Sequence, residues 1–288
     1  MRILLFGKLG QVAWELRRSL SPLGEVISLG RSELNLENIN VLRDTIKTIK
    51  PQAIVNAAAY TAVDKAEEEP EKAKLVNADA PGVIAEEAAR LNALLVHYST
   101  DYIFDGTKEA PYLEDDTPNP INVYGETKLA GENNIRALTD KYLILRTCWI
   151  YGDRGNNFYL SMLKLGQQRR QIRVVNDQFG APTWSRMVAE ATAMLLCQLE
   201  SIEKWPTGIY HLTAGGKVSW FNFARLIFKS SDSIPKSPVE VIPVSSEDFK
   251  TIAKRPKNSV MSSEKIYNDY GIKLPHWEKA LELMMDCK

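Results

Sequence analysis

The chain has 288 residues, enough to bury a large core as one big domain or as one domain with a smaller lobe. Lys and Arg number 36, and Asp and Glu also number 36, so the formal net charge is zero. With no basic stripe, no acidic tract and no apolar stretch near the roughly 20 residues that cross a bilayer, we expect neither nucleic acid nor a membrane as a partner.

Two features of the sequence predict a cytoplasmic protein. In the N-terminal segment Met1 to Gly7, glycine and a charged helix follow the apolar run too soon for a signal peptide, so it is read as a first strand. The three cysteines, Cys148, Cys197 and Cys287, are widely scattered and lack metal-ligand spacing. They predict buried thiols, with neither a disulfide framework nor a zinc site.

Short apolar runs alternate with helical patterns through the first half of the chain. The predicted strands are Ile3–Phe6, Val26–Leu29, Ala53–Ala58, Leu94–Tyr98 and Tyr142–Leu145. The predicted helices are Val12–Leu20, Val41–Ile49, Val83–Leu91 and Tyr124–Leu138. This alternation indicates βαβ units and an α/β fold with a doubly wound, Rossmann-type parallel sheet, whose ligands bind at the carboxyl ends of the strands.

The glycine-rich turn after the first strand is a candidate dinucleotide site. Gly7-x-x-Gly10-x-x-Ala13 follows a strand and opens a helix. Glycines at these positions permit a tight turn and let the backbone approach a pyrophosphate at the helix N-terminus. The spacing differs from Gly-x-Gly-x-x-Gly, but its place in the chain favours dinucleotide binding over a plain turn.

The end of the second predicted strand bears on cofactor choice. An Asp or Glu there would bind the ribose hydroxyls of NAD, yet the sequence reads Leu29-Gly30-Arg31-Ser32. Arg31 can form charge-assisted bonds to a 2′-phosphate. The sequence therefore favours NADPH over NADH, the alternative being an ordinary exposed arginine.

Two further segments supply candidate catalytic groups. The fourth strand runs into Tyr98-Ser99-Thr100-Asp101, where the Thr100 or Ser99 hydroxyl can donate to a substrate carbonyl or simply cap the strand end. Tyr124 and Lys128 lie one helical turn apart. We expect the Lys128 ammonium to lower the pKa of the Tyr124 phenol, which can then protonate a carbonyl oxygen as a hydride arrives at carbon.

The regular alternation ends near residue 148. Apolar pieces follow at Arg173–Val175, Met187–Leu199, Gly208–Thr213 and Trp220–Phe228, before a polar tail that begins near Ser230. We interpret residues 1–148 as the dinucleotide-binding domain and residues 149–288 as mostly a second, smaller, discontinuous substrate lobe. Some of the later helices and strands are expected to return to the first domain.

These segments together resemble the extended short-chain dehydrogenase/reductases, and within them the dTDP-4-dehydrorhamnose reductase family. The resemblance covers almost the whole chain. It rests on Leu4 to Val12, Val55 to Asp64, His97 to Phe104, Tyr124 to Glu132, Gly155 to Phe158, Asn176 to Thr183 and Arg255 to Ser259. The Ser-Thr-Asp-Tyr and Asp-Gln-x-Gly-x-Pro-Thr segments are specific to this branch.

The resemblance implies NADPH- or NADH-dependent reduction of the C4 keto group of dTDP-4-dehydro-L-rhamnose. It assigns the residues that bind the cofactor as Gly7, Gly10, Gln11, Val12, Ala59, Tyr60, Thr61 and Tyr98. Tyr124 is implied as proton donor, and Lys128 as the ligand of the nicotinamide ribose. Thr100, Asp101 and Trp149 are implied to meet the sugar, with the indole stacked on a pyranose face or packed in the core.

The resemblance leaves several alternatives open. Some family members bind Mg²⁺ through glutamates at a dimer interface, and Glu15 stands in a matching place. A Mg²⁺ site and a homodimer are therefore open alternatives. A non-catalytic regulatory module is a second class, since the β subunit of methionine adenosyltransferase shares this fold. A reductase of another 4-keto nucleotide sugar is a third alternative.

Overall fold

A parallel sheet of the doubly wound kind forms the centre of the computed structural model, which describes residues 1–200, 207–230 and 239–287. The sheet has the strand order β10-β5-β4-β3-β1-β2, and every neighbouring pair is parallel. Its strands are β1 (Arg2–Phe6), β2 (Glu25–Leu29), β3 (Ala53–Asn56), β4 (Leu94–Thr100), β5 (Tyr142–Thr147) and β10 (Gly208–His211). The predicted fold class is confirmed.

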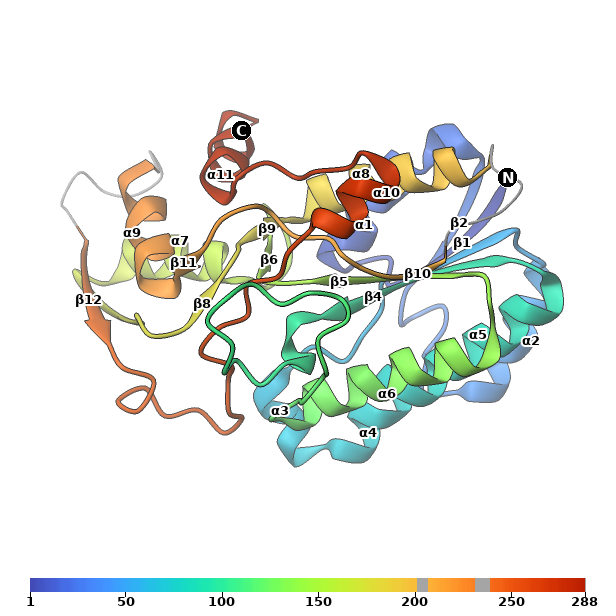
Figure 1. Cartoon of the computed structure of the whole chain (residues 1–288), viewed down its shortest axis with the longest axis horizontal. Helices are drawn as coiled ribbons and strands as arrows, with labels where there is room; N and C mark the ends of the chain where they lie inside the picture. The colour runs from blue at the N-terminus through green and yellow to red at the C-terminus, as the bar shows by residue number, and fades with distance from the viewer. Residues whose placement is uncertain (201–206, 231–238, 288) are drawn as a thin grey trace.

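Side chains alternate across the sheet, so each face carries its own apolar cluster. Ile3 and Leu5 on β1 belong to the cluster on one face, and Leu4 and Phe6 to the cluster on the other. The first face is covered by α1 (Gln11–Ser19), α8 (Ser185–Glu200) and α10 (Glu264–Tyr270). The second is covered by α2 (Ile39–Ile49), α5 (Ala80–Leu91) and α6 (Val123–Leu138), as Figure 1 shows.

Two elements of the main layer come from the second half of the chain. The strand β10 pairs with β5 from Gly208 opposite Leu143 to His211 opposite Arg146. The helix α8 packs on α1, where the Ser19 hydroxyl donates to the Ala189 carbonyl at 3.0 Å. The first 148 residues therefore do not complete this layer by themselves.

A further apolar cluster, separate from those on the two faces, lies beyond the carboxyl ends of the sheet. Its helices are α7 (Phe158–Gln168), α9 (Trp220–Ser230) and α11 (Trp277–Asp286). Its short strands are β6 (Ile150–Tyr151), β7 (Gln171–Val175), β8 (Phe179–Gly180), β9 (Thr183–Trp184), β11 (Val218–Ser219) and β12 (Glu240–Val244). These elements form a smaller lobe beside the sheet.

The segment between β3 and α5 is helical, which the sequence patterns did not predict. It contains α3 (Val63–Glu68), α4 (Pro70–Lys74) and the π-helical turn η2 (Leu75–Asp79). The one-turn 3₁₀ helices are η1 (Ser21–Leu23) and η3 (Asp101–Ile103). The elements α3, α4 and η2 are only five or six residues long, and Pro70 separates the first two. Helices this short show too little apolar periodicity to be predicted from the sequence.

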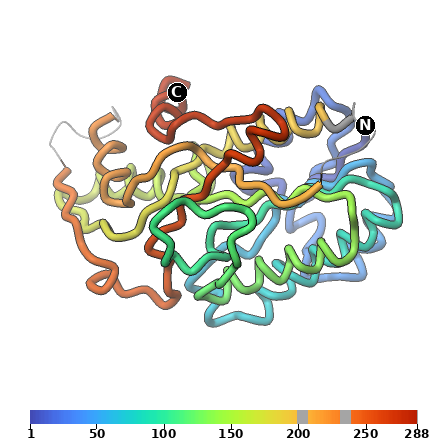
Figure 2. Tube along the Cα trace, viewed as in Figure 1, coloured from blue at the N-terminus to red at the C-terminus, as the bar shows by residue number. Residues whose placement is uncertain are grey.

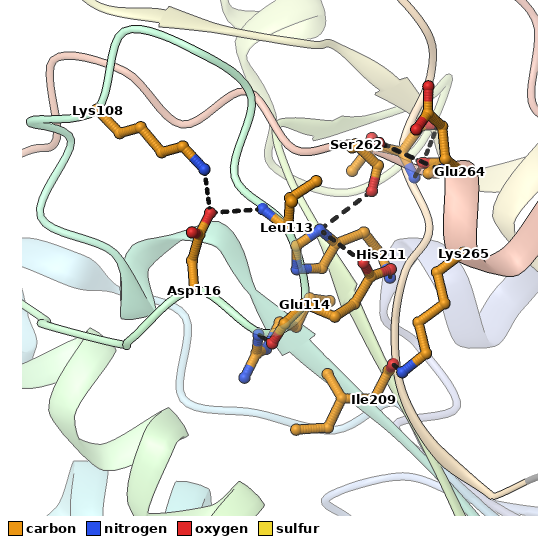
Figure 3. Close-up of polar contacts among 12 residues, drawn as sticks. Lys108, Leu113, Glu114, Asp116, Ile209, His211, Ser262, Glu264 and Lys265 are labelled. Atoms are coloured by element: carbon orange, nitrogen blue, oxygen red, sulfur yellow. Dashed lines mark hydrogen bonds and ion pairs between the residues drawn. The ribbon is translucent and has the colours of Figure 1, made fainter.

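The loop after η3 is held against the C-terminal segment. Tyr112 donates its N–H to the Val260 carbonyl and accepts from the N–H of Ser262 at 2.8 Å each, and Figure 2 shows the two segments side by side. At the end of β10, the His211 N–H donates to the Glu114 carboxylate at 2.9 Å (Figure 3). These bonds fix the loop against the C-terminal segment and the end of β10.

Candidate functional site

One cavity at the carboxyl ends of the strands, of about 730 Å³, brings the predicted site residues together. It is lined by all of Gly7, Gly10, Gln11, Val12, Arg31, Ala59, Tyr60, Thr61, Tyr98, Thr100, Asp101, Tyr124, Lys128 and Trp149. The cavity lies where β1 and β3 are neighbours and the chain order of the sheet reverses. Open α/β sheets bind their ligands at such a point.

The turn after β1 is built for close approach of a ligand. Gly7 has a φ of 98°, and a Cβ there would lie 2.8 Å from the Ala57 carbonyl oxygen, so glycine is required. The Gly10 N–H donates to the Gly7 carbonyl at 2.7 Å, which tightens the turn. The helix α1 then begins at Gln11 with no side-chain cap, so its first N–H groups face the cavity and fit a pyrophosphate.

At the far end of this cavity, Arg31 is paired with an acid that the sequence patterns did not reveal. Arg31 Nη2 lies 2.7 Å from Glu37 Oε1, and Lys72 lies 3.9 Å from the same oxygen. The Glu33 carboxylate accepts from the Gly30 N–H at 3.0 Å. No carboxylate stands at the end of β2 itself, but Glu37, several residues beyond that strand, lines the same cavity.

Thr100 ends β4 and Asp101 begins η3, and both line the cavity. The Thr100 hydroxyl donates to Asp101 Oδ1 at 3.0 Å and accepts from the Tyr102 N–H at 3.1 Å. Asp101 Oδ2 is buried with no hydrogen-bond partner among the described residues, and burial raises the pKa of this carboxyl to about 7. The Ser99 hydroxyl is likewise buried and unpartnered in the described part of the chain.

Tyr124 lies at the start of α6, with its ring edge-on to the Tyr102 ring at 5.7 Å between centroids. Burial raises the pKa of the Tyr124 phenol to about 12, against a hydrogen bond with Thr100 that lowers it. Lys128 does not offset that rise, so the expected lowering of the phenol pKa by Lys128 is wrong for this arrangement. The phenol is held protonated, as a proton donor requires.

Lys128 is fully enclosed one turn further along α6, with 2% of its surface exposed. Its Nζ donates to the Tyr98 carbonyl at 2.6 Å and lies 3.2 Å from His97 Nε2. Burial lowers its pKa to about 8, while Glu132 acts in the opposite direction. The Tyr98 hydroxyl is bonded to Thr192 on α8 at 2.6 Å, so that hydroxyl is committed to the helix packing.

Trp149 is stacked on a second indole that the sequence did not single out. The rings of Trp149 and Trp220 are parallel within 8°, with centroids 3.4 Å apart, and both line the cavity. Trp149 has a φ of 46°, an uncommon backbone conformation for a large residue. A Cβ on Gly180 would lie 2.4 Å from the Trp149 ring, so this glycine makes room for the indole.

The structure gives no support for a metal site. No group of three or more His, Cys, Asp or Glu side chains that could hold an ion occurs among the described residues. Glu15 is instead held by two guanidinium groups, with Arg18 and Arg186 each 3.3 Å away.

Of the cysteines only Cys148 is buried, so the prediction of buried thiols is wrong for Cys197 and Cys287.

None of the described helices is long and apolar enough to cross a membrane.

The sequence matches the RmlD substrate binding domain family over residues 1–288. It is 43% identical to dTDP-4-dehydrorhamnose reductase of Burkholderia thailandensis, over 98% of this chain and 97% of that one. The chain belongs to this family. The Escherichia coli K12 dTDP-4-dehydrorhamnose reductase is 42% identical over 99% of this chain and 97% of its own length.

Solved structures of the family have the same fold. A dTDP-4-dehydrorhamnose reductase from Bacillus anthracis in complex with NADP aligns with a TM-score of 0.91 and 35% identity, covering 100% of this chain and 99% of that one. One from Clostridium acetobutylicum aligns with a TM-score of 0.93 and 36% identity, with the same coverage. The resemblance that the sequence predicted is confirmed at the level of family and fold.

Proposed function

We propose that this chain is a dTDP-4-dehydrorhamnose reductase that reduces the C4 keto group of dTDP-4-dehydro-L-rhamnose to give dTDP-L-rhamnose. The observation that carries the proposal is the convergence of Tyr124, Lys128 and Thr100 on one cavity, in a chain of this family. The bound nicotinamide cofactor would supply the hydride. The turn from Gly7 to Gln11 fits its pyrophosphate, and the Lys128 ammonium would donate to its ribose.

In this proposal Tyr124 gives the phenol proton to the substrate oxygen as C4 is reduced, so that the keto oxygen becomes a hydroxyl. Its raised pKa keeps the phenol protonated until then. The Thr100 hydroxyl would donate to the same oxygen, provided that its hydrogen is released from Asp101. A carboxyl that carries its proton on Oδ1 would donate to the Thr100 oxygen and leave the Thr100 hydrogen for the substrate, so the protonation state of Asp101 bears on the role of Thr100.

The test is turnover of the purified protein with NADPH and dTDP-4-dehydro-L-rhamnose, followed by loss of NADPH absorbance. We expect Tyr124→Phe to lower kcat by about 10²–10⁴-fold, the usual contribution of general acid catalysis, with little change in substrate binding. Tyr267→Phe is the control, since this tyrosine is exposed and lies outside the cavity lining. A Tyr124→Phe protein within a few-fold of wild-type turnover would remove Tyr124 from the mechanism.

The same assay separates the other functions. A non-catalytic regulatory module would bind a dinucleotide without consuming it, although Tyr124 and Lys128 are both present. A reductase of another nucleotide sugar would favour a different member of a panel of 4-keto nucleotide sugars. A preference for NADPH, a homodimer and a cytoplasmic location stay predictions beside this proposal, as does the division at residue 148.

A further inference from the structure

A line of buried polar side chains runs beneath Lys128 from strand to strand. Asn56 on β3, His97 on β4 and Lys128 on α6 are 1%, 0% and 2% exposed. Asn56 Nδ2 lies 3.1 Å from His97 Nδ1, and His97 Nε2 lies 3.2 Å from Lys128 Nζ. None of the roles proposed above uses Asn56 or His97.

The direction of each bond in this line follows from a backbone group. The Ala58 N–H, which can only donate, points to Asn56 Oδ1 at 3.2 Å and so fixes the orientation of the amide. The Asn56 NH₂ group therefore faces His97, and His97 Nδ1 must accept from it. A neutral imidazole that accepts at Nδ1 carries its hydrogen on Nε2.

That hydrogen points at Lys128. Burial lowers the pKa of His97 well below its usual value, so the ring is neutral. An ammonium has three donors and no lone pair, and thus cannot accept from Nε2–H. A neutral amine can accept there while it donates to the Tyr98 carbonyl.

We propose that His97 is a positioning residue that stabilises the neutral amine of Lys128 over its ammonium, by donating Nε2–H to the Lys128 nitrogen. The imidazole acts through the lysine and lies beneath it. The other tautomer of His97 would only move the clash between two donors, because its Nδ1–H would then face the NH₂ group of Asn56. Every bond in this line is made only when Lys128 is uncharged, so protonating Lys128 costs the bond from His97.

The charges around Lys128 leave this effect in place. Lys128 lies on α6, against which β4, β5 and η3 pack. The titratable and charged groups of these elements are Tyr124, Glu126, Glu132 and Arg136 on α6, His97 and Tyr98 on β4, Tyr142 and Arg146 on β5, and Asp101 and Tyr102 on η3. Glu132 alone favours the ammonium, and its carboxylate is engaged by Arg146 at 2.7 and 3.0 Å. Burial acts in the same direction as His97 and lowers the Lys128 pKa.

A functional consequence rests on the function proposed above, in which Lys128 donates to the ribose of the cofactor as an ammonium. Binding then takes up a proton wherever the pH exceeds the midpoint of Lys128 titration. We expect the NADPH dissociation constant, measured by fluorescence, to rise by roughly tenfold for each increase of one in pH above that midpoint. In His97→Gln the rise should begin at higher pH.

The direct test is the titration of Lys128 itself, with protein labelled at lysine ¹³Cε and the Lys128 signal assigned through Lys128→Arg. We expect a wild-type midpoint at least about one pH unit below the ordinary lysine value of 10.5. Glutamine at position 97 can turn its carbonyl toward the lysine and accept from an ammonium. His97→Gln should therefore raise the midpoint by about one pH unit or more.

A second variant reverses the line without removing the histidine. In Asn56→Asp, one carboxylate oxygen still accepts from the Ala58 N–H, and the other faces His97 Nδ1. His97 must then carry its hydrogen on Nδ1 in order to donate to that oxygen. Its Nε2 lone pair is left facing Lys128. We expect ¹⁵N spectra to show the Nε2–H tautomer in the wild type and Nδ1–H in this variant, with a raised Lys128 midpoint. His211→Gln is the matched control, an equally buried histidine on β10, and should leave that midpoint unchanged.

A wild-type Lys128 that titrates with the surface lysines, or a wild-type His97 with its hydrogen on Nδ1, would overturn the inference even if turnover is normal. The ¹⁵N tautomer measurement needs only the folded wild type, so unfolding of a variant does not prevent the test. Neither measurement needs cofactor or substrate. A protein that shows the expected titration but never reduces a nucleotide sugar would retain this inference and lose the proposed function.

Discussion

Asp101, which lines the cavity, differs in its charge state from an ordinary aspartate. Its carboxyl is 3% exposed and has an unpartnered oxygen in the described structure. An unfolded chain ionises this group near pH 3.8, whereas the folded protein keeps its proton up to about pH 7. The folded state is therefore destabilised as the pH rises from about 4 through 7.

The variant Asp101→Asn should remove this pH dependence. We expect the wild type to lose on the order of 2–4 kcal/mol of stability between pH 4 and pH 8 through this group, since a tenfold difference in proton affinity between the folded and unfolded states corresponds to about 1.4 kcal/mol. Asparagine cannot ionise, so the difference in unfolding free energy between these pH values should shrink by that amount. Urea denaturation at both pH values measures it, with Asp115→Asn as an exposed control. Equal pH dependence in both proteins would mean that Asp101 is ionised in the folded state.

Arg31 and Glu37 set the expected choice of cofactor. A 2′-phosphate gains a charge-assisted bond of about 1.5–3 kcal/mol from Arg31, but must compete with the Glu37 pair, worth up to about 1 kcal/mol at an exposed site. We expect Arg31→Ala to lower the ratio of kcat/KM for NADPH over NADH by roughly two- to thirtyfold. Glu37→Gln should raise that ratio by freeing the guanidinium.

The control is Arg17→Ala, an exposed arginine on α1 that does not line the cavity. Its ratio should match the wild type. A ratio unchanged in Arg31→Ala and Glu37→Gln alike would show that Arg31 binds no phosphate.

At the scale of elements, the short strand β8 determines where the Trp149 indole lies. An added Cβ on Gly180 overlaps the ring, so Gly180→Ala must displace Trp149 and separate it from Trp220. We expect a loss of about 1–3 kcal/mol in stability, as for overpacking in a core, and loss of the near-UV circular dichroism of the coupled indoles. Turnover should fall as well if Trp149 meets the sugar.

Gly215→Ala is the control for this substitution. Its Cβ would meet His276 at 3.7 Å, which is ordinary contact. The control should therefore keep the stability and the near-UV spectrum of the wild type. An unchanged spectrum in Gly180→Ala would mean that the stack tolerates the added methyl group.

At the scale of the whole molecule, the ion pair between Asp64 and Arg255 connects segments far apart in the sequence. Arg255 lies 2.6 Å from the Asp64 carboxylate at the start of α3 and hydrogen-bonds it through a second nitrogen at 3.1 Å. The Arg255 hydrogen bond lowers the Asp64 pKa. Its contribution to stability is therefore present above the ordinary pKa of 3.8 and is lost as the pH falls through the lower folded value.

A double-mutant cycle of Asp64→Ala and Arg255→Ala should show this coupling. Because Asp64 is 40% exposed, we expect only about 0.5–1 kcal/mol at pH 7, and progressively less as the pH falls below 3.8. The pair Lys279–Glu282, more than half exposed on α11, should give a smaller coupling. Coupling that does not weaken as the pH falls below 3.8 would contradict an ionic origin.

The sequence predicted the parts of the site that depend on local patterns. These positions lie at the ends of strands or near the start of a helix: Gly7 follows β1, Thr100 ends β4, and Tyr124 and Lys128 lie in the first turns of α6. The order of the strands brings such positions to one edge of the sheet. The rest depends on contacts between distant segments. Glu37 reaches Arg31 from beyond the strand end, and Trp220 reaches Trp149 from α9.

The charge states were harder to predict than the positions. A Tyr and a Lys one turn apart suggested a lowered phenol pKa, but the depth of burial, which raises it, cannot be read from spacing. The line of side chains from Asn56 through His97 to Lys128 forms only because β3, β4 and α6 pack together. The periodicity of the sequence does not predict such contacts between distant segments.

The strand β10 has a consequence for how the protein is made. A ribosome adding roughly 5–20 residues per second releases β5 several seconds before β10 exists to pair with it. During that interval the nascent sheet presents the bare edge of β5, and α1 has no α8 to cover it. A bare edge invites pairing with a neighbouring chain, so crowded polysomes expose this protein to aggregation until its late strand emerges.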